Sequence, residues 1–230
     1  MGHHQKLNLL KLEFTNFNSK VNQQRISKFL EGVTICSSLR QIDISFKNSD
    51  TCVDGIQVMS QSISNNLNLK VLQLELYFSN LNDEKIKYLC QGISKSKKLC
   101  KFDISLSEKN RLTDNSIVYL SKTIVQLPNL QILVINLIMN NLGETGIGQI
   151  LGQSISKCQN LKSLVLNLVD NKISQNDAEI LCKEISKSGQ LNRLKIYLYF
   201  QNRQDKVNNR KKLLQICQKT KKLISLAIYA

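Results

Sequence analysis

The sequence has very little proline and histidine. Its 230 residues include one proline, Pro128, and two histidines, His3 and His4. Both histidines lie outside the repeated part of the chain described below, so no Ser–His or Cys–His pair is available there for nucleophilic catalysis. The phosphate-binding patterns G-x-x-x-x-G-K-[ST] and G-x-G-x-x-G after a strand are missing too. These absences argue against an enzyme.

Long apolar runs and paired cysteine motifs are missing as well. No window of about 18 uninterrupted apolar residues occurs, so the sequence predicts no membrane span. The N-terminus, residues 1–11, has no small-residue cleavage site of the kind that ends a secretory signal. The seven cysteines contain no C-x-x-C pair, which disfavours zinc-ribbon and thioredoxin-type centres. We therefore expect buried thiols, no disulfide and an intracellular location, cytoplasmic or nuclear.

What the sequence does contain is one repeated pattern, L-x-x-[LIF]-x-[LI]-x-[LF], with alanine at the last position of the eighth copy. Successive copies start 32, 30, 30, 31, 31, 30 and 32 residues apart. Such regular spacing is typical of a solenoid of stacked units. The pattern starts at Leu7, Leu39, Leu69, Leu99, Leu130, Leu161, Leu191 and Leu223.

Each unit changes from the period of a strand to that of a helix. Apolar and variable residues alternate over 72–76, which predicts a strand with one buried face. Further along, Ile86, Leu89 and Ile93 recur at helical spacing. The same offsets in the first unit select Ile26, Phe29 and Val33 as the buried face of its helix. Strands joined by such helices must run parallel.

Turns and helix starts also follow the repeat. Asparagines after the strands are able to bond the backbone where the strand ladder stops. Asp83, Asp114 and Asn176 are the predicted helix caps, and the glycine-rich segment 143–148 is read as a helix entry. Small residues in the helices are expected to let helix pack closely on strand. The asparagines are Asn48, Asn80, Asn110, Asn141, Asn171 and Asn202, and the small residues are Gly32, Ser62, Gly92, Thr123 and Ser154.

The pattern resembles the leucine-rich-repeat family, and the repeat length points to its ribonuclease-inhibitor-like subclass. The resemblance extends from Leu7 to Ala230. It implies a horseshoe with parallel strands on the concave side and helices on the convex side. We therefore expect one α/β domain over residues 1–230, a solenoid of eight strands and seven helices. The resemblance also implies binding of proteins, and a few relatives activate small GTPases.

The residues between the buried strand positions form the candidate binding surface. They fall into three zones along the chain, acidic, aliphatic and tyrosine-rich, and clustered apolar and tyrosine side chains are typical of contact surfaces. A blander alternative is that β-branched residues simply suit strands. The acidic zone is Glu13, Asp43, Glu75 and Asp103; the aliphatic zone is Val134, Ile138, Val165 and Val169; the tyrosine zone is Lys195, Tyr197, Tyr199 and Tyr229.

Three of the acids also permit a metal hypothesis. Asp43, Glu75 and Asp103 lie on successive predicted strands, and hard cations prefer carboxylate ligands. Nothing else in the sequence completes a coordination shell, so an acidic docking surface is the favoured interpretation. We predict no metal and no cofactor.

Positive charge is concentrated near the end of the chain. Residues 183–222 hold 12 Lys and Arg against 2 Asp and Glu, a net charge of +10 out of +15 for the whole chain. Such a patch attracts nucleic acid, acidic proteins or anionic surfaces. Because no aromatic residues alternate with these cations, a solvated helix face is the favoured reading. The patch is Arg210, Lys211, Lys212, Lys219, Lys221 and Lys222.

These features predict a non-catalytic scaffold that binds a protein partner on its concave face. One alternative is a nucleic-acid-associated protein that uses the basic C-terminal end. A second, by family analogy alone, is a regulator of small GTPases. The last predicted strand, 223–230, has no following helix, so we also expect its edge to be covered by another chain or another copy.

Overall fold

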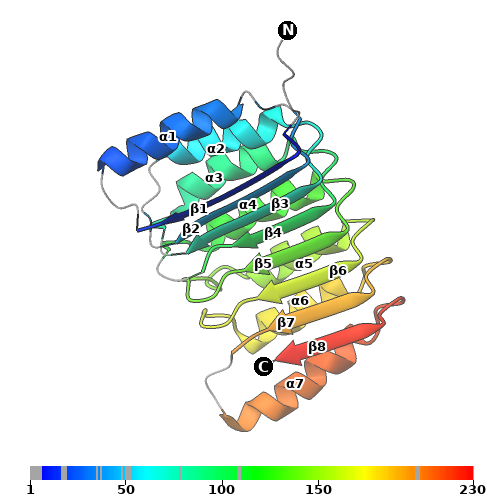
Figure 1. Cartoon of the computed structure of the whole chain (residues 1–230). Helices are drawn as coiled ribbons and strands as arrows, with labels where there is room; N and C mark the ends of the chain where they lie inside the picture. The colour runs from blue at the N-terminus through cyan, green and yellow to red at the C-terminus, as the bar shows by residue number, and fades with distance from the viewer. Residues whose placement is uncertain are drawn as a thin grey trace.

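The computed structural model describes residues 7–16, 20–34, 36, 38–47, 49, 53–77, 79–107, 110–199 and 203–229. Over these residues eight strands alternate with seven helices, and the helices lie on one side of a single open sheet (Figure 1). The strands are β1 (Leu9–Thr15), β2 (Gln41–Lys47), β3 (Val71–Tyr77), β4 (Lys101–Ser105), β5 (Ile132–Asn136), β6 (Ser163–Asn167), β7 (Arg193–Tyr197) and β8 (Ser225–Tyr229). The helices are α1 (Lys20–Thr34), α2 (Val53–Asn65), α3 (Asp83–Ile93), α4 (Asp114–Val125), α5 (Ile147–Ser156), α6 (Gln175–Ile185) and α7 (Arg203–Cys217).

The sheet register reproduces the sequence repeat. The strands follow chain order from β1 to β8, and every neighbouring pair is parallel. Leu9 pairs with Gln41, 32 residues later, and Lys101 pairs with Ile132, 31 residues later. The offset of each strand pair equals the spacing between the corresponding pattern starts. The predicted α/β leucine-rich-repeat solenoid, with its eight strands and seven helices, is confirmed in the described residues.

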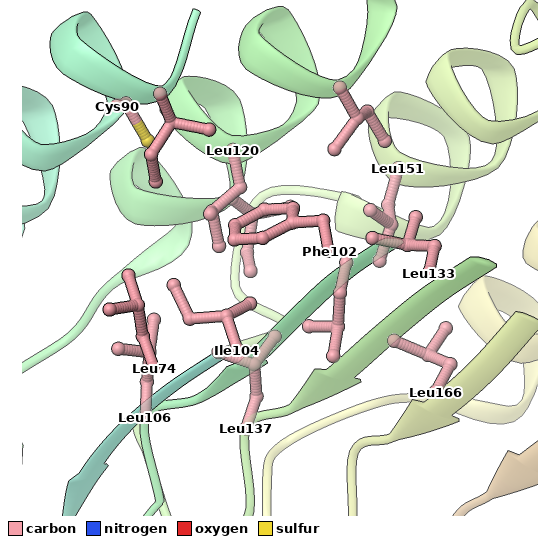
Figure 2. Close-up of a cluster of buried hydrophobic side chains, with 14 of the residues drawn as sticks. Leu74, Cys90, Phe102, Ile104, Leu106, Leu120, Leu133, Leu137, Leu151 and Leu166 are labelled. Atoms are coloured by element: carbon pink, nitrogen blue, oxygen red, sulfur yellow. The ribbon is translucent and has the colours of Figure 1, made fainter. Parts of the chain in front are cut away.

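The core lies between the sheet and the helices. Leu74, Ile104, Leu133 and Leu166, which belong to the pattern, are at most 1% exposed. Figure 2 shows their side chains directed at the helices, from which Leu120 and Leu151 point back toward them. The buried side chains of all units join into one continuous cluster.

The predicted buried face of the first helix is wrong at one position. Phe29 is 50% exposed, and the next residue, Leu30, is fully buried in its place. Ile26 and Val33 are buried as predicted, so the spacing in α1 is four residues and then three. Both spacings place three side chains on one face of a helix. Packing in the core of the first unit decides which of the two side chains is buried. The Phe29 ring lies edge-on against Phe14, with 6.5 Å between ring centroids.

Two predicted turn asparagines bond as expected. The Asn110 side chain donates to the carbonyl oxygens of Leu76 and Leu106 and accepts from the backbone N–H of Leu81. Asn171 repeats this arrangement in a later unit. One amide therefore joins two neighbouring units where the strand ladder ends.

In two other units a neighbouring residue takes this position. Asn140, and not the predicted Asn141, donates to the carbonyls of the preceding unit and its own. Ser79, and not Asn80, bonds the corresponding carbonyls, while Asn80 adopts a left-handed backbone with φ of 49°. The turns vary in length, so a fixed offset misses the bonded residue. The predicted Asn48 and Asn202 lie outside the described residues.

The helix caps also differ from the prediction. The N-caps are Asn82, Thr113 and Ser174, one or two residues before the predicted Asp83, Asp114 and Asn176. Asp83 instead accepts hydrogen bonds from the backbone N–H and hydroxyl of Thr113. Asp114 likewise accepts from the backbone N–H groups of Gly143 and Thr145. These carboxylates therefore connect each helix start to the following unit.

The glycine-rich segment is a helix entry, as predicted. Gly146 is the N-cap of α5 and has a left-handed φ of 77°. Gly143 has φ of 108°, and a Cβ atom there would lie 2.5 Å from the carbonyl oxygen of Lys172. Only glycine combines this backbone with so close a neighbour.

The small helix residues serve a different contact from the one predicted. A Cβ atom on Gly92 would lie 2.2 Å from the carbonyl oxygen of Ser60, which belongs to the adjacent helix. The Ser62 hydroxyl donates across to the carbonyl of Leu30 in α1. These residues therefore bring helix against helix and not helix against strand. Gly32 has no neighbour within 4 Å of such an atom and makes no close contact of this kind.

All six cysteines within the described residues are free, and Cys52 lies outside them. Burial raises the pKa of the Cys90 thiol to about 12 and that of Cys158 to about 11. The Cys182 thiol contacts that of Cys217 in the next helix, and this contact, together with burial, raises the pKa of Cys182. The repeat offsets did not predict this pair, because the two cysteines occupy different positions in their units. No helix in the described part of the chain is long and apolar enough to cross a membrane.

The core predicts a sharp contrast between adjacent residues. Leu133 is fully buried, whereas Ile132 beside it is 39% exposed. We expect Leu133→Ala to lower the free energy of unfolding by about 2–5 kcal/mol, because it leaves a cavity. The control Ile132→Ala is expected to cost less than about 1 kcal/mol. Urea denaturation measures both; equal losses would contradict the register.

The thiols predict a graded reactivity. In the native protein we expect iodoacetamide to modify the partly exposed Cys36 and Cys100 well before Cys90 and Cys158, whose burial and raised pKa suppress the thiolate. Peptide mapping after timed alkylation measures the order. In denaturant without reductant, intact mass should show all seven cysteines modified. A smaller number would reveal a disulfide.

Candidate functional site

The candidate site is the sheet face directed away from the helices, called here the concave face. Alternate strand residues point to this face, and the strand register aligns them into rows. One row runs from Asp43 in β2 to Lys195 in β7. All twelve predicted binding residues are at least partly exposed. Nine lie on the strands, and Ile138, Val169 and Tyr199 follow β5, β6 and β7.

The acids of β1–β4 do not form a freely acidic surface. Three of the four pair with lysines of the same face, and the fourth, Glu75, accepts a hydrogen bond from Ser45 at 3.1 Å. The ion pairs are Glu13–Lys47 at 2.8 Å, Asp43–Lys11 at 3.9 Å and Asp103–Lys101 at 3.9 Å. Exposed ion pairs add little stability, but in each pair the lysine neutralises the charge of the acid. We call the concave residues of β1–β4 the mixed-charge surface.

Asp103 is the most constrained acid of the mixed-charge surface. Burial raises the pKa of its carboxyl, the nearby Lys101 opposes this, and the charges of Glu75 and Asp43 add to the rise. The three acids do not converge on a cation position, and no group of three or more metal-ligating side chains gathers elsewhere in the described ranges. The acids therefore face solvent as partly paired single charges.

The aliphatic zone is continuous and extends beyond the predicted residues. Val134 of β5 pairs in register with Val165 of β6, and both are partly exposed. Ile132, two residues before Val134, is 39% exposed on the same face. Met139, just after β5, is 50% exposed and has a left-handed φ of 57°. Ile132 occupies the third position of the repeat, whereas the predicted binding residues occupy the fifth, seventh and ninth positions.

The tyrosine zone contains a stacked pair. The rings of Tyr197 and Tyr229, register partners on β7 and β8, lie 4.5 Å apart with an interplanar angle of 5°. Tyr199 and Tyr229 are 47% and 48% exposed. Stacking holds the pair in one orientation, so the rings present a fixed apolar surface next to the aliphatic zone.

Two asparagines lie on this face at the seventh position of the repeat, but sequence reasoning did not select them as binding residues. The side-chain oxygens of Asn136 and Asn167 accept hydrogen bonds from the backbone N–H groups of Ile138 and Val169, at 3.3 and 3.2 Å. Because an amide oxygen must face an N–H, these bonds fix both amide orientations. The two Nδ2 groups have no acceptor among the described residues. Asn136 and Asn167 are register partners, so two free donors lie side by side.

The predicted basic patch is partly neutralised. Three of its six cations are engaged with neighbouring groups, and Lys211, Lys219 and Lys221 stay exposed without a partner in the described part of the chain. The engaged cations are Arg210, which donates to the Ile228 carbonyl at 2.8 Å, Lys212, which pairs with Glu179 at 2.7 Å, and Lys222, which donates to Gln190 at 2.7 Å. The patch therefore offers fewer free cations than its composition suggests.

Arg210 also protects the last strand. Ser225 and Tyr229 direct their backbone groups toward β7, so Leu226 and Ile228 direct theirs to the open edge of β8. The Arg210 side chain occupies the outward carbonyl of Ile228. A charged side chain at a sheet edge opposes pairing with a further strand. The predicted covering of this edge by another chain stays a prediction.

Comparison with known proteins adds little. No protein-family model matches the sequence, and no curated protein matches it. Among solved structures, the chain is similar to internalin C2 of Listeria monocytogenes, with 13% identity, a TM-score of 0.43 and coverage of 85% of this chain and 74% of that one. It is also similar to actin-binding site 2 of leiomodin-1, with 9% identity, a TM-score of 0.43 and coverage of 88% and 90%. Evidence for a function therefore comes from the chain's own residues.

The pKa of Asp103 predicts a stability that depends on pH. Because folding raises this pKa, the folded state holds the proton more tightly, and stability declines as pH rises through the interval between the unfolded and folded values. Asp103→Asn removes this titration. We expect Asp103→Asn to be more stable than the wild type at pH 7, with a difference that vanishes below the ordinary pKa of about 3.9.

Asp83→Asn is the matched control with the opposite sign. Burial raises the pKa of Asp83, but hydrogen bonds from Ser116 and Thr113 outweigh burial and lower it. Its contribution to stability is therefore present at neutral pH and is lost as pH falls through the folded-state value. Urea denaturation from about pH 3 to pH 8 measures both variants. Shifts of the same sign would contradict the assignment.

Proposed function

We propose that this protein is a non-catalytic scaffold that binds a partner protein on its concave face, mainly over β5–β8. The observation that carries the proposal is the exposed row of aliphatic side chains beside the stacked tyrosines. Clustered exposed apolar groups mark contact surfaces, and tyrosines are favoured anchors of interfaces. Because stacking already orders the Tyr197 and Tyr229 rings, binding restricts them little further.

Met139 supports the same surface. A left-handed backbone costs a residue other than glycine about 1–2 kcal/mol, and asparagine or aspartate tolerates it best. Asp170 occupies the equivalent turn after β6 with φ of 55°, whereas Met139 places a half-exposed apolar side chain in that strained position. Strained residues concentrate where proteins bind ligands. An exposed methionine at this turn is therefore better explained by contact with a partner than by folding.

The alternatives have weaker support. Nucleic-acid binding at the basic C-terminal end is disfavoured, because three of the six cations of the patch already bond neighbouring groups. Regulation of small GTPases rests on family analogy alone, and the repeat spacing of 30–32 residues is the sole support for the ribonuclease-inhibitor-like subclass. The unpaired thiols favour an intracellular location, since oxidising compartments promote disulfides.

The proposal predicts that one substitution on the concave face abolishes partner capture. We expect Val165→Glu to reduce recovery of the partner from cell extract by roughly tenfold or more, because it buries a charge in an apolar contact. Val125→Glu is the matched control, since Val125 is 43% exposed at the end of α4 on the opposite side of the sheet. Quantitative mass spectrometry of the bound proteins gives the ratio. Equal recovery by both variants, each folded by circular dichroism, would reject concave-face binding.

A further inference from the structure

The concave face changes character between β4 and β5. The strands β5–β8 contain no aspartate or glutamate, and their charged residues are Arg193 and Lys195. Both are exposed, and neither pairs with an acid within the described ranges. Among the acids of the chain, the one nearest in sequence to any of these four strands is Asp170, in the turn beyond β6. Unlike the mixed-charge surface, this half carries positive charge that no acid within the described residues balances.

The free polar groups of this half are mostly donors. Arg193 and Lys195 have donors and no acceptor. The amide oxygens of Asn136 and Asn167 are occupied by backbone N–H groups, which leaves their Nδ2 donors available. We call the concave residues of β5–β8 the donor surface. Its complement is a group rich in acceptors and negative charge, and carboxylates form the strongest hydrogen bonds with such donors.

The spacing of the cations points to an extended segment. Arg193, Lys195 and Tyr197 are alternate residues of β7, so they lie on one face at intervals of about 6.6 Å. Alternate side chains of an extended peptide repeat at the same interval. A peptide laid along β7 therefore matches Arg193 and Lys195 with two of its alternate side chains, and the next one reaches the stacked tyrosines.

We propose that the donor surface binds an extended acidic segment of the partner protein, with carboxylates at alternate positions over Arg193 and Lys195 and an apolar side chain against Tyr197 and Tyr229. This inference rests on the proposed function and adds the chemistry of the partner. A second copy of this chain is a poor occupant, because the chain carries a net charge of +15.

Single-stranded nucleic acid fits the surface less well. Bases bind by stacking on free aromatic faces, but Tyr197 and Tyr229 stack on each other and cover one face each. The neighbouring Ile132, Val134 and Val165 suit apolar side chains. Two cations also neutralise few phosphates, whereas nucleic-acid binding relies on many such contacts.

To test this, peptides that bind the wild-type protein are selected from a phage-displayed library of random dodecapeptides. Selected clones are then assayed on Arg193→Glu/Lys195→Glu and on Lys211→Glu/Lys221→Glu, which changes the net charge equally on exposed residues away from the concave face. We expect clones lost on the first variant and kept on the second to be enriched in Asp or Glu at alternate positions. A synthetic peptide from such a clone should bind the first variant roughly tenfold more weakly, or worse, with little change on the second.

A single isosteric substitution provides a second measurement. Asn167→Asp keeps the oxygen that accepts from Val169 and replaces the free amide donor with a negative oxygen. We therefore expect the fold to be preserved and the acidic peptide to bind several-fold more weakly, because like charges now face each other. Asn208→Asp, an exposed position on α7, is the matched control. An unchanged affinity of Asn167→Asp would reject the assigned role of the asparagine donors.

The outcomes separate the two proposals. Clones lost on Val165→Glu but neutral in composition would overturn the acidic segment and leave concave-face binding intact. Clones that bind every concave variant as well as the wild type would overturn both. Tighter binding of a deoxythymidine dodecamer than of any acidic peptide, abolished by Arg193→Glu/Lys195→Glu, would assign the surface to nucleic acid instead.

Discussion

Contact between neighbouring strand–helix units is the interaction on which the rest of this molecule depends. A single unit cannot bury its apolar side chains, so each one completes the core of the next. The units join at three levels, through the parallel ladder, through turn amides such as Asn110 and Asn171, and through the carboxylates of Asp83 and Asp114. Because all the described helices lie on one side, no described helix covers the opposite face of the sheet (Figure 1).

Side chains on the concave face therefore do not pack in the core, so their composition is free to vary. It differs between the two halves of the sheet. On β1–β4 lysines and acids alternate and satisfy each other, as the Glu13–Lys47 pair illustrates. On β5–β8 aliphatic, tyrosine and cationic side chains stand without acidic neighbours on the strands. Folding alone requires no such contrast, since exposed strand positions accept either composition. The difference between the halves is thus more informative about binding than the composition of either one.

Sequence reasoning predicts the architecture because the register of the sheet is the repeat itself. It fails by one or two residues where a local contact decides the outcome: Leu30 replaces Phe29 in the core, Asn140 replaces Asn141, and Asn82 replaces Asp83 as a cap. On the concave face the repeat positions predict where the acids lie, but not that three of them pair with lysines. The donor role of Asn136 is likewise hidden, because it depends on which amide atom faces the Ile138 backbone.

An open parallel sheet offers two routes to a partner, along its edge or across its face. Arg210 already occupies the outward carbonyl of Ile228, so one acceptor that an added strand requires is taken. On the concave face the backbone groups are already paired between neighbouring strands, so no side chain has to block them. Side chains alone can make contacts there, and recognition must depend on their chemistry. A partner that contacts this face is therefore selected by charge and by apolar pattern and not by backbone pairing, which is the basis for proposing Arg193, Lys195 and the stacked tyrosines as its contacts.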